Sequence, residues 1–323
     1  MAGWTRRGLP ALALVAAAAG CGSSAPHFQG RSDAGVHYDC LTDSPDRRAV
    51  VFDRLAEAHV GWVRINVNWR GLEPVSRGDW DPEVLDALDD CIDKAVAHGI
   101  RPDLTLTGDP EWAKSGADFR SPPSNLADYA AAIGFLAKRY RGRVRAWEIW
   151  NEENTTRFWT GTAADYTTLL RAAYPAVKAA DPDALVVFGS TLGNDTKWIQ
   201  AAYAAGAKGF FDVMATHPYP PDHLSTVAAV RAAMDENGDG RKPIWFTEIG
   251  WAAPLRMTLT EQARRLTDLF AYARKDLPYV KVVIWFQALA ASPGASPWEH
   301  DLELLNDDLS PRPAYETLKR LAG

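Results

Sequence analysis

The sequence contains few residues of the types that build metal clusters or disulfide frameworks. Only three cysteines and seven histidines occur among 323 residues. The histidines show no H-x-x-x-H spacing and no pair beside a carboxylate motif, so we expect no metal site. No G-x-G-x-x-G turn follows the first strand-like segment, which argues against a dinucleotide-binding fold. The sequence therefore predicts a protein without metal or cofactor.

Long apolar runs are also missing after the first 20 residues. A membrane-spanning helix needs about 20 consecutive apolar residues, so none is expected in the later chain. The charge is moderately acidic, with a net value of −6. This balance argues against nucleic acid or an anionic membrane surface as a partner. No repeat or low-complexity tract follows residue 33, and we expect one domain over residues 34–323 and a monomer.

The first 20 residues have the features of a secretory signal. Arg6 and Arg7 precede an apolar run over residues 9–19, which is too short to cross a bilayer. The run ends in Ala-Ala-Gly before Cys21, and this resembles a bacterial lipobox. We expect residues 1–20 to be removed, Cys21 to be lipidated, and residues 21–33 to form a tether at the outer face of the cell membrane. An ordinary signal cleaved nearby, with an incidental cysteine, is the alternative.

The two remaining cysteines allow two interpretations. Cys40 and Cys91 would be the only available disulfide pair in an oxidising compartment. Cys91 falls inside a predicted helix, where a small buried thiol is the alternative. The sequence leaves this question open.

Strand-like and helical segments alternate eight times along the chain. The predicted strands are near-continuous apolar or β-branched runs, typical of a buried parallel sheet, and cover residues 34–39, 62–68, 101–107, 144–150, 184–189, 211–216, 243–248 and 280–286. A helix is predicted over 82–98, with Pro82 in its first turn, and another over 260–270. Eight such units predict a single (β/α)8 barrel, an α/β fold whose active site lies at the C-terminal ends of the strands.

Two glutamates stand at such strand ends. Glu152 follows the fourth predicted strand, and Glu248 ends the seventh. A carboxylate there is costly unless it is solvated or hydrogen-bonded. Hydrolysis of a glycosidic bond needs two carboxyl groups, one protonated and one ionised. The pair therefore predicts a glycoside hydrolase. Glu148, two residues before Trp150, is interpreted as structural.

At these residues the sequence resembles clan A of the glycoside hydrolases, especially family 5 cellulase-like and family 39 xylosidase-like enzymes. The clan carries its acid/base as the glutamate of an Asn-Glu pair, here Asn151 and Glu152, and its nucleophile as a glutamate like Glu248. The resemblance implies a retaining enzyme that cleaves β-linked poly- or oligosaccharides.

The same resemblance implies a set of sugar-binding residues. It implies that Arg64 hydrogen-bonds the nucleophile and that Asn151 binds the sugar 2-hydroxyl. His217 and Tyr219 are expected to line the reactive subsite. Tryptophans are expected to stack on sugar rings. The residues expected to contact substrate are Arg64, Asn151, Trp112, His217, Tyr219, Trp251 and Trp285.

Two other functions fit the same residues. A non-catalytic glycan-binding lipoprotein would use a decayed barrel, although both glutamates are present. A transglycosylase of the same fold would transfer the sugar to another sugar instead of water. Product analysis distinguishes these from a hydrolase.

Overall fold

The computed structural model describes residue 1 and residues 33–323, apart from positions 117, 220–222, 254–256 and 291–295. The predicted signal, most of the tether and Cys21 lie outside this described part. Within it, no helix combines the length and the apolar character needed to cross a bilayer.

Each of the eight predicted strand segments contains a strand, and all neighbouring strands are parallel. The strands are β1 (Ala34–His37), β2 (Trp62–Asn68), β3 (Arg101–Thr107), β4 (Ala146–Ile149), β5 (Leu185–Val187), β6 (Thr191–Leu192), β7 (Met214–His217), β8 (Ile244–Ile249) and β9 (Val280–Trp285). Their order is β5-β4-β3-β2-β1-β9-β8-β7-β6. The short β6 follows β5 directly in the chain. The Phe188 amide donates to the Val213 carbonyl at 2.9 Å, so the sheet curls back on itself.

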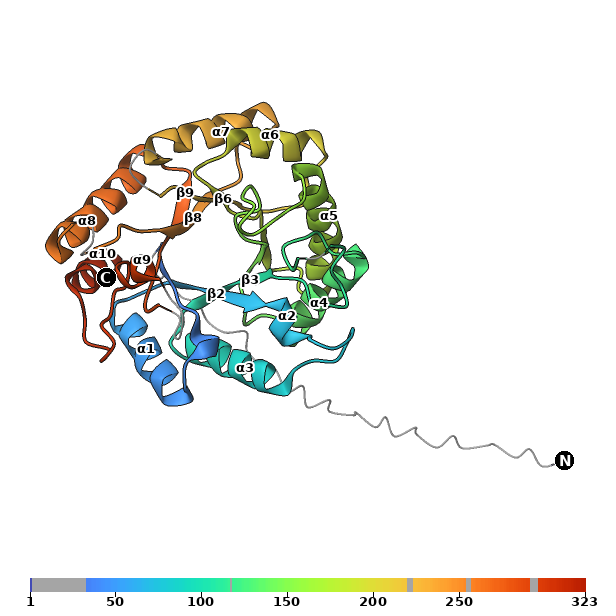
Figure 1. Ribbon diagram of the computed structural model, residues 1–323, viewed down its shortest axis with the longest axis horizontal. Coiled ribbons are helices and arrows are strands. Elements are labelled where there is room, and N and C mark those ends of the chain that lie inside the picture. The colour runs from blue at the N-terminus through green and yellow to red at the C-terminus, as the bar shows by residue number, and fades with distance from the viewer. Residues whose placement is uncertain (2–32, 117, 220–222, 254–256, 291–295) are drawn as a thin grey trace.

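A ring of helices surrounds these strands in Figure 1. The longer helices are α1 (Pro45–Glu57), α3 (Pro82–Ala97), α4 (Leu126–Arg139), α5 (Ala163–Ala180), α6 (Thr196–Ala204), α7 (Val227–Glu236), α8 (Leu259–Asp276) and α10 (Pro313–Ala322). Short helical turns are η1 (Cys40–Thr42), α2 (Trp69–Leu72), η2 (His223–Thr226) and α9 (Pro297–His300). The strands inside and the helices outside confirm the predicted (β/α)8 barrel in a single domain.

Helix starts follow the capping signals in the sequence. The Asp81 side chain accepts hydrogen bonds from the first-turn amides of α3, and the Thr258 side chain accepts one at the start of α8. Such caps satisfy backbone donors that have no partner within the helix. The helix predicted over 260–270 extends to Asp276.

Side chains inside the barrel form layers from its closed end toward the site. At the floor, the rings of Trp62 and Trp245 lie 4.6 Å apart in a small apolar cluster. Gly35 makes this packing possible, because a Cβ there would lie 2.8 Å from the Ile284 side chain. Alternate residues of a strand point to the same face. Arg64, two residues after Trp62 on β2, therefore enters the barrel directly above the apolar floor.

Cys40 and Cys91 form a disulfide. Cys40 begins the η1 turn that follows β1, whereas Cys91 is buried in α3. The bridge ties the first strand-end loop to an outer helix. The sequence left a disulfide and a buried free thiol as alternatives, and the structure contains the disulfide.

Candidate active site

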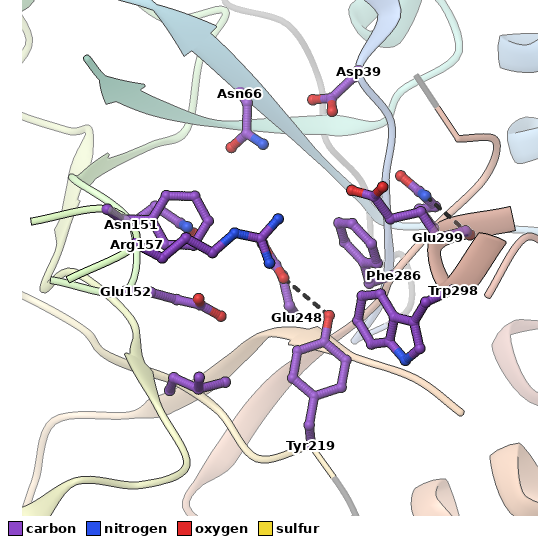
Figure 2. Close-up of a pocket in the computed structure, with 13 residues that line it drawn as sticks. Asp39, Asn66, Asn151, Glu152, Arg157, Tyr219, Glu248, Phe286, Trp298 and Glu299 are labelled. Carbon is purple, nitrogen blue, oxygen red and sulfur yellow. Dashed lines mark hydrogen bonds between the residues drawn. The ribbon is translucent and has the colours of Figure 1, made fainter. Parts of the chain in front are cut away.

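A cavity of about 430 Å³ opens at the C-terminal ends of the strands (Figure 2). The loops after β1, β4 and β9 and the ends of β2 and β8 all contribute side chains to it. Its lining consists of Asp39, Asn66, Asn151, Glu152, Arg157, Phe158, Leu192, Tyr219, Glu248, Phe286, Gln287, Trp298 and Glu299. Both predicted catalytic glutamates are among them.

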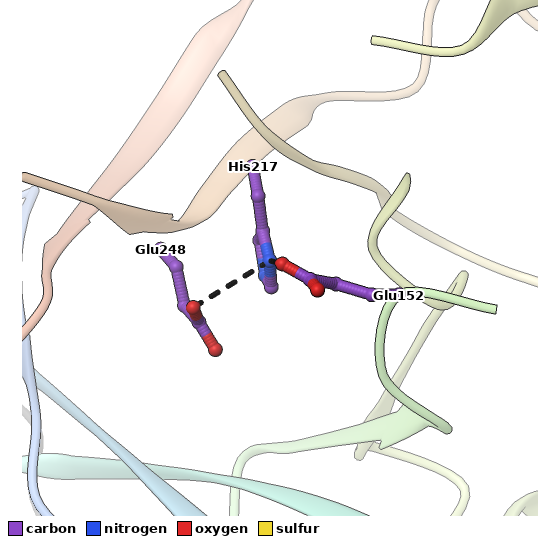
Figure 3. A group of neighbouring side chains, drawn as sticks. All are labelled: Glu152, His217 and Glu248. Carbon is purple, nitrogen blue, oxygen red and sulfur yellow. Dashed lines mark hydrogen bonds and ion pairs between the residues drawn. The ribbon is translucent and has the colours of Figure 1, made fainter. Parts of the chain in front are cut away.

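Glu152 and Glu248 face each other across the cavity floor with His217 between them (Figure 3). One carboxylate oxygen of each glutamate and one His217 ring nitrogen lie within 4.8 Å of one another. Each glutamate is only 7% exposed, and His217 is completely buried. The fold therefore brings together two carboxyl groups that are 96 residues apart in the chain.

Arg64 holds Glu248 from below. Its guanidinium donates to Oε1 of Glu248 at 2.6 Å, to Oε2 of Glu148 at 2.7 Å, and to Oδ1 of Asn151 at 2.8 Å. Arg64 and Glu148 are completely buried. Because the planar guanidinium presents its donors in a fixed geometry, it sets the relative positions of all three partners. The amide N–H groups of Asn151 take no part in the hydrogen bond to Arg64, and the side chain of Asn151 lines the cavity.

Glu248 is stabilised as a carboxylate. Burial acts to raise its pKa, but the charges of His217, Arg64 and His37 act in the opposite direction. The Tyr219 hydroxyl also donates to Oε2 of Glu248 at 2.9 Å. Together these interactions hold the pKa of Glu248 below its ordinary value.

A chain of hydrogen bonds orients His217. The Thr247 hydroxyl lies 3.1 Å from Oε1 of Glu148, and a carboxylate only accepts, so Thr247 donates there. Thr247 is then the acceptor for Nε2–H of His217 at 3.2 Å. Nδ1 of His217 faces Oε1 of Glu152 at 2.8 Å. A hydrogen bond at this contact requires one proton, carried either by the Glu152 carboxyl or by the imidazole.

Glu148 has the structural role expected from the sequence. Besides Arg64 and Thr247, it accepts a hydrogen bond from the Thr105 hydroxyl at 3.1 Å. It lies two residues after Ala146 of the barrel floor, on the same face of β4. Its charge balances Arg64 inside the barrel and never reaches the cavity.

The backbone that presents Glu152 is in an unfavourable conformation. Trp150 has a φ of 71° and Glu152 a φ of 44°, both in the left-handed region that side chains with a Cβ rarely adopt. Strain of this kind costs about 1–3 kcal/mol per residue and concentrates at functional sites. Packing holds it in place, since the Trp150 ring is buried against Trp159 and its indole N–H donates to the Phe158 carbonyl.

The structure places the tryptophans expected to contact sugar away from the cavity. Trp285 is completely buried, donates its indole N–H to the Leu302 carbonyl, and stacks on Trp251 outside the barrel. Trp112 donates to the Glu73 carbonyl and packs against Trp69. None of Trp112, Trp251 and Trp285 lines the cavity. Strand alternation explains Trp285: Val282 and Ile284 point into the barrel, so Trp285 points outward and Phe286 inward.

Arg64 makes the hydrogen bond to Glu248 that the resemblance implies, but Arg64 and His217 were also expected to contact substrate. Neither lines the cavity, and both are completely buried beneath it. They touch the two catalytic candidates instead, so they position these carboxyl groups. Tyr219 and Asn151 do line the cavity, as expected for residues that contact a sugar.

The aromatic wall of the cavity comes from residues that sequence reasoning missed. Phe286 and Trp298 have ring centroids 6.3 Å apart, and Trp298 lies 5.7 Å from the ring of Tyr219. Trp298 is 39% exposed on the short helix α9. Apolar faces of this kind suit stacking on sugar rings. The alternation along β9 could have indicated Phe286, whereas Trp298 depends on the course of a loop.

The glutamate pair and His217 also have the spacing of metal ligands. Glu248 already accepts hydrogen bonds from Arg64 and Tyr219, and Glu152 is in hydrogen-bond contact with His217. A second group of potential ligands is His300, Glu303 and Asp307, where Glu303 pairs with Arg312. Two neighbouring carboxyl groups of this kind are able to supply acid/base and nucleophilic chemistry.

Comparison with known proteins gives the family. The profile of the cellulase family (glycosyl hydrolase family 5) matches residues 32–276. The chain belongs to this glycoside hydrolase family.

Two curated relatives share part of the sequence. A β-xylosidase from Caldicellulosiruptor saccharolyticus is 32% identical over 165 residues, covering 46% of this chain and 33% of the relative. Beta-glucosidase 5 from Oryza sativa subsp. japonica is 29% identical over 127 residues, covering 39% of this chain and 24% of the relative. The matched region thus spans a third or less of each relative.

Solved structures share the fold over most of the chain. A family 39 glycoside hydrolase from Bacteroides cellulosilyticus WH2 has a TM-score of 0.76 at 23% identity, covering 90% of this chain and 64% of that one. A GH5_18 enzyme from Streptomyces cattleya, solved in complex with Manβ1-4GlcNAc, has a TM-score of 0.75 at 19% identity, covering 91% and 80%. These neighbours support the barrel fold.

Proposed function

We propose that this glycosidase cleaves β-linked poly- or oligosaccharides with retention of configuration, using Glu152 as acid/base and Glu248 as nucleophile. The observation that carries the proposal is the close pairing of the two carboxyl groups. Carboxyl groups of retaining enzymes lie about 5–5.5 Å apart, whereas inverting enzymes leave about 6.5–9.5 Å for a water molecule. Oxygens of Glu152 and Glu248 lie within 4.8 Å of each other, which is closer than the separation that an inverting enzyme needs for its water molecule and so supports retention.

In the first step Glu248 attacks the anomeric carbon while Glu152 gives its proton to the leaving oxygen. The sugar is then bonded to Glu248, and the leaving sugar departs as an alcohol. In the second step Glu152, now a carboxylate, takes a proton from water, and the oxygen of that water displaces Glu248. The two inversions together retain the configuration.

The surroundings support different roles for the two glutamates. Glu248 receives hydrogen bonds from Arg64 and Tyr219, which favour the ionised nucleophile. Glu152 contacts neither of these donors and shares a proton with Nδ1 of His217. A His217 imidazole that shares a proton with the Glu152 carboxyl suits a residue that acts as an acid in the first step and as a base in the second.

The test is product release from a panel of β-glucans, xylans, mannans and aryl β-glycosides, with Glu248→Gln as the control. Wild type is expected to release a sugar whose anomeric configuration, read by NMR before mutarotation, is β. Glu248→Ala with added azide is expected to yield an α-glycosyl azide, because the small anion occupies the place of the missing carboxylate. An α-configured first product, or normal activity in Glu248→Ala, would contradict the mechanism.

We also propose that the chain acts at the outer face of the cell membrane, held by a lipid on Cys21. The basic pair, the short apolar run and the small residues before Cys21 support this location. In a bacterial host, labelled palmitate is expected to enter the full-length chain and not Cys21→Ala. Incorporation in both forms, or in neither, would contradict lipidation at this cysteine.

A further inference from the structure

The charges that line the active-site cavity are unevenly distributed. Four lining residues carry carboxyl groups: Asp39, Glu152, Glu248 and Glu299. Arg157 is the single cationic residue of the lining in the described part of the chain. In Figure 2 Arg157 extends from the side of Asn151 and Glu152 toward the centre of the cavity, and Asp39 and Glu299 lie on the opposite side.

Arg157 has no anionic partner in the described part of the protein. Among the described residues its guanidinium makes no hydrogen bond or ion pair; its one recorded contact places Cζ 5.1 Å from the ring centroid of Phe158. Phe158 lines the cavity as well. This contact with the ring leaves the donors of the guanidinium available to a ligand.

The carboxylates on the other side are engaged by the protein. Asp39 pairs with Nε2 of His37 at 3.1 Å, and Glu299 accepts the Ser296 amide in the cap of α9. Burial acts to raise the pKa of Asp39, but His37 and Arg64 outweigh it and hold that pKa below its ordinary value. This side of the cavity therefore repels an anionic sugar and accepts hydroxyl donors.

The proposed mechanism gives these two sides different roles. Glu152 protonates the leaving oxygen, so it lies toward the sugar that departs. Arg157 follows Glu152 by five residues in the same loop. We propose that Arg157 binds an anionic group, such as the carboxylate of a uronic acid, on the leaving-group side of the scissile bond, while the sugar transferred to Glu248 is neutral. This inference rests on the proposed function and narrows its substrate to acidic glycans.

The test uses matched probes. Each pair has a 4-carboxyphenyl and a 4-carbamoylphenyl β-glycoside of the same sugar, with glucose, xylose and mannose as the three sugars. Affinities are measured by calorimetry in Glu248→Gln, which binds without turnover, and in the same protein with Arg157→Gln added. Arg171→Gln is the matched control, because Arg171 is also exposed and lies 5.1 Å from a phenylalanine ring, that of Phe210.

We expect the carboxylate probe of at least one pair to bind about tenfold more tightly at low salt, as expected for a charge-assisted hydrogen bond. Arg157→Gln should bring the ratio of the two affinities, carboxylate probe to amide probe, close to one. Arg157→Lys should keep part of this preference, and Arg171→Gln should leave it unchanged. The preference should also shrink at high salt, because the site is open to solvent. Equal affinities within every pair, a ratio insensitive to Arg157→Gln, or no binding by any probe would overturn the proposal.

Turnover by the wild-type enzyme separates this inference from the proposed function. If cleavage depends on Glu248 but shows no preference for the charged probe, the proposed role of Arg157 is wrong and the proposed glycosidase activity stands. If the preference depends on Arg157 but no probe is cleaved, the anion site is supported and the proposed hydrolase activity is contradicted.

Discussion

Arg64 and Glu248 form a buried ion pair, with Nη1 and Oε1 2.6 Å apart, at the boundary between the barrel interior and the cavity. Arg64 is completely buried, whereas Glu248 reaches the cavity surface. The ion pair therefore lets the fold control the charge of a group that is open to substrate. Because Glu148 accepts from the same guanidinium, the position of Glu248 is linked to the interior network.

Tyr219→Phe is expected to raise the pKa of Glu248. The hydroxyl donates to the carboxylate, so its removal favours the protonated form. Glu248, as the proposed nucleophile, must be ionised, so activity should fall as the pH drops through this pKa. The acidic limb of the kcat/KM profile should therefore move to higher pH, by about one unit for a lost interaction of ~1.4 kcal/mol.

Tyr272→Phe is the matched control, because Tyr272 lies on the outer surface of α8. Its pH profile should coincide with that of wild type. A lower rate in Tyr219→Phe with an unmoved acidic limb would mean that Tyr219 contacts substrate without tuning Glu248.

Glu152→Ala should affect substrates according to their leaving groups. General acid catalysis contributes about 10²–10⁴-fold, and only a poor leaving group needs the proton. Loss of kcat/KM should thus be large for phenyl glycosides and small for 2,4-dinitrophenyl glycosides. Steady-state kinetics on such a series measures the dependence. Equal losses across the series would argue against the acid/base role.

The barrel could be predicted from the sequence because its strands are continuous apolar runs with a regular spacing. The convergence of Glu152 and Glu248 could be predicted because the fold places every strand end at one rim. Their distance apart depends on the curvature of the sheet and could not be predicted.

The aromatic contacts were harder to predict, for a physical reason. Adjacent residues of a strand point in opposite directions, so a choice between Trp285 and Phe286 depends on the strand register. The larger aromatic residue faces outward here and packs on Trp251. Asp39 and Arg157 lie on loops and Trp298 on the short helix α9 after β9. The paths of these connections depend on tertiary contacts that a single sequence does not specify.

Glu153→Gln is expected to change the pH dependence of stability. Glu153 is 1% exposed, and burial raises its pKa to about 8. The unfolded chain has the ordinary pKa, so between about pH 4.3 and the folded value the folded state binds the additional proton. Wild-type stability should decrease as the pH rises through this window and then level off.

The glutamine variant cannot ionise, so this component of the decrease should be absent from it. The melting temperature of the variant minus that of the wild type should increase as the pH is raised from 5 to 9. The trend is the result to compare, since a buried amide also costs stability at every pH. Parallel curves would show that Glu153 does not hold its proton in the folded state.

Removal of the Cys40–Cys91 bridge is expected to destabilise the barrel without altering its chemistry. The disulfide joins residues separated by 51 positions and limits the freedom of the unfolded chain. Loss of such a bridge typically costs about 2–4 kcal/mol. Cys40→Ser combined with Cys91→Ser should therefore lower the melting temperature by roughly 4–16 °C, at ~2–4 °C per kcal/mol for a domain of this size. A thiol titration of the unfolded protein should find both cysteines oxidised in the parent. A melting temperature insensitive to both the double substitution and reduction would contradict a stabilising bridge.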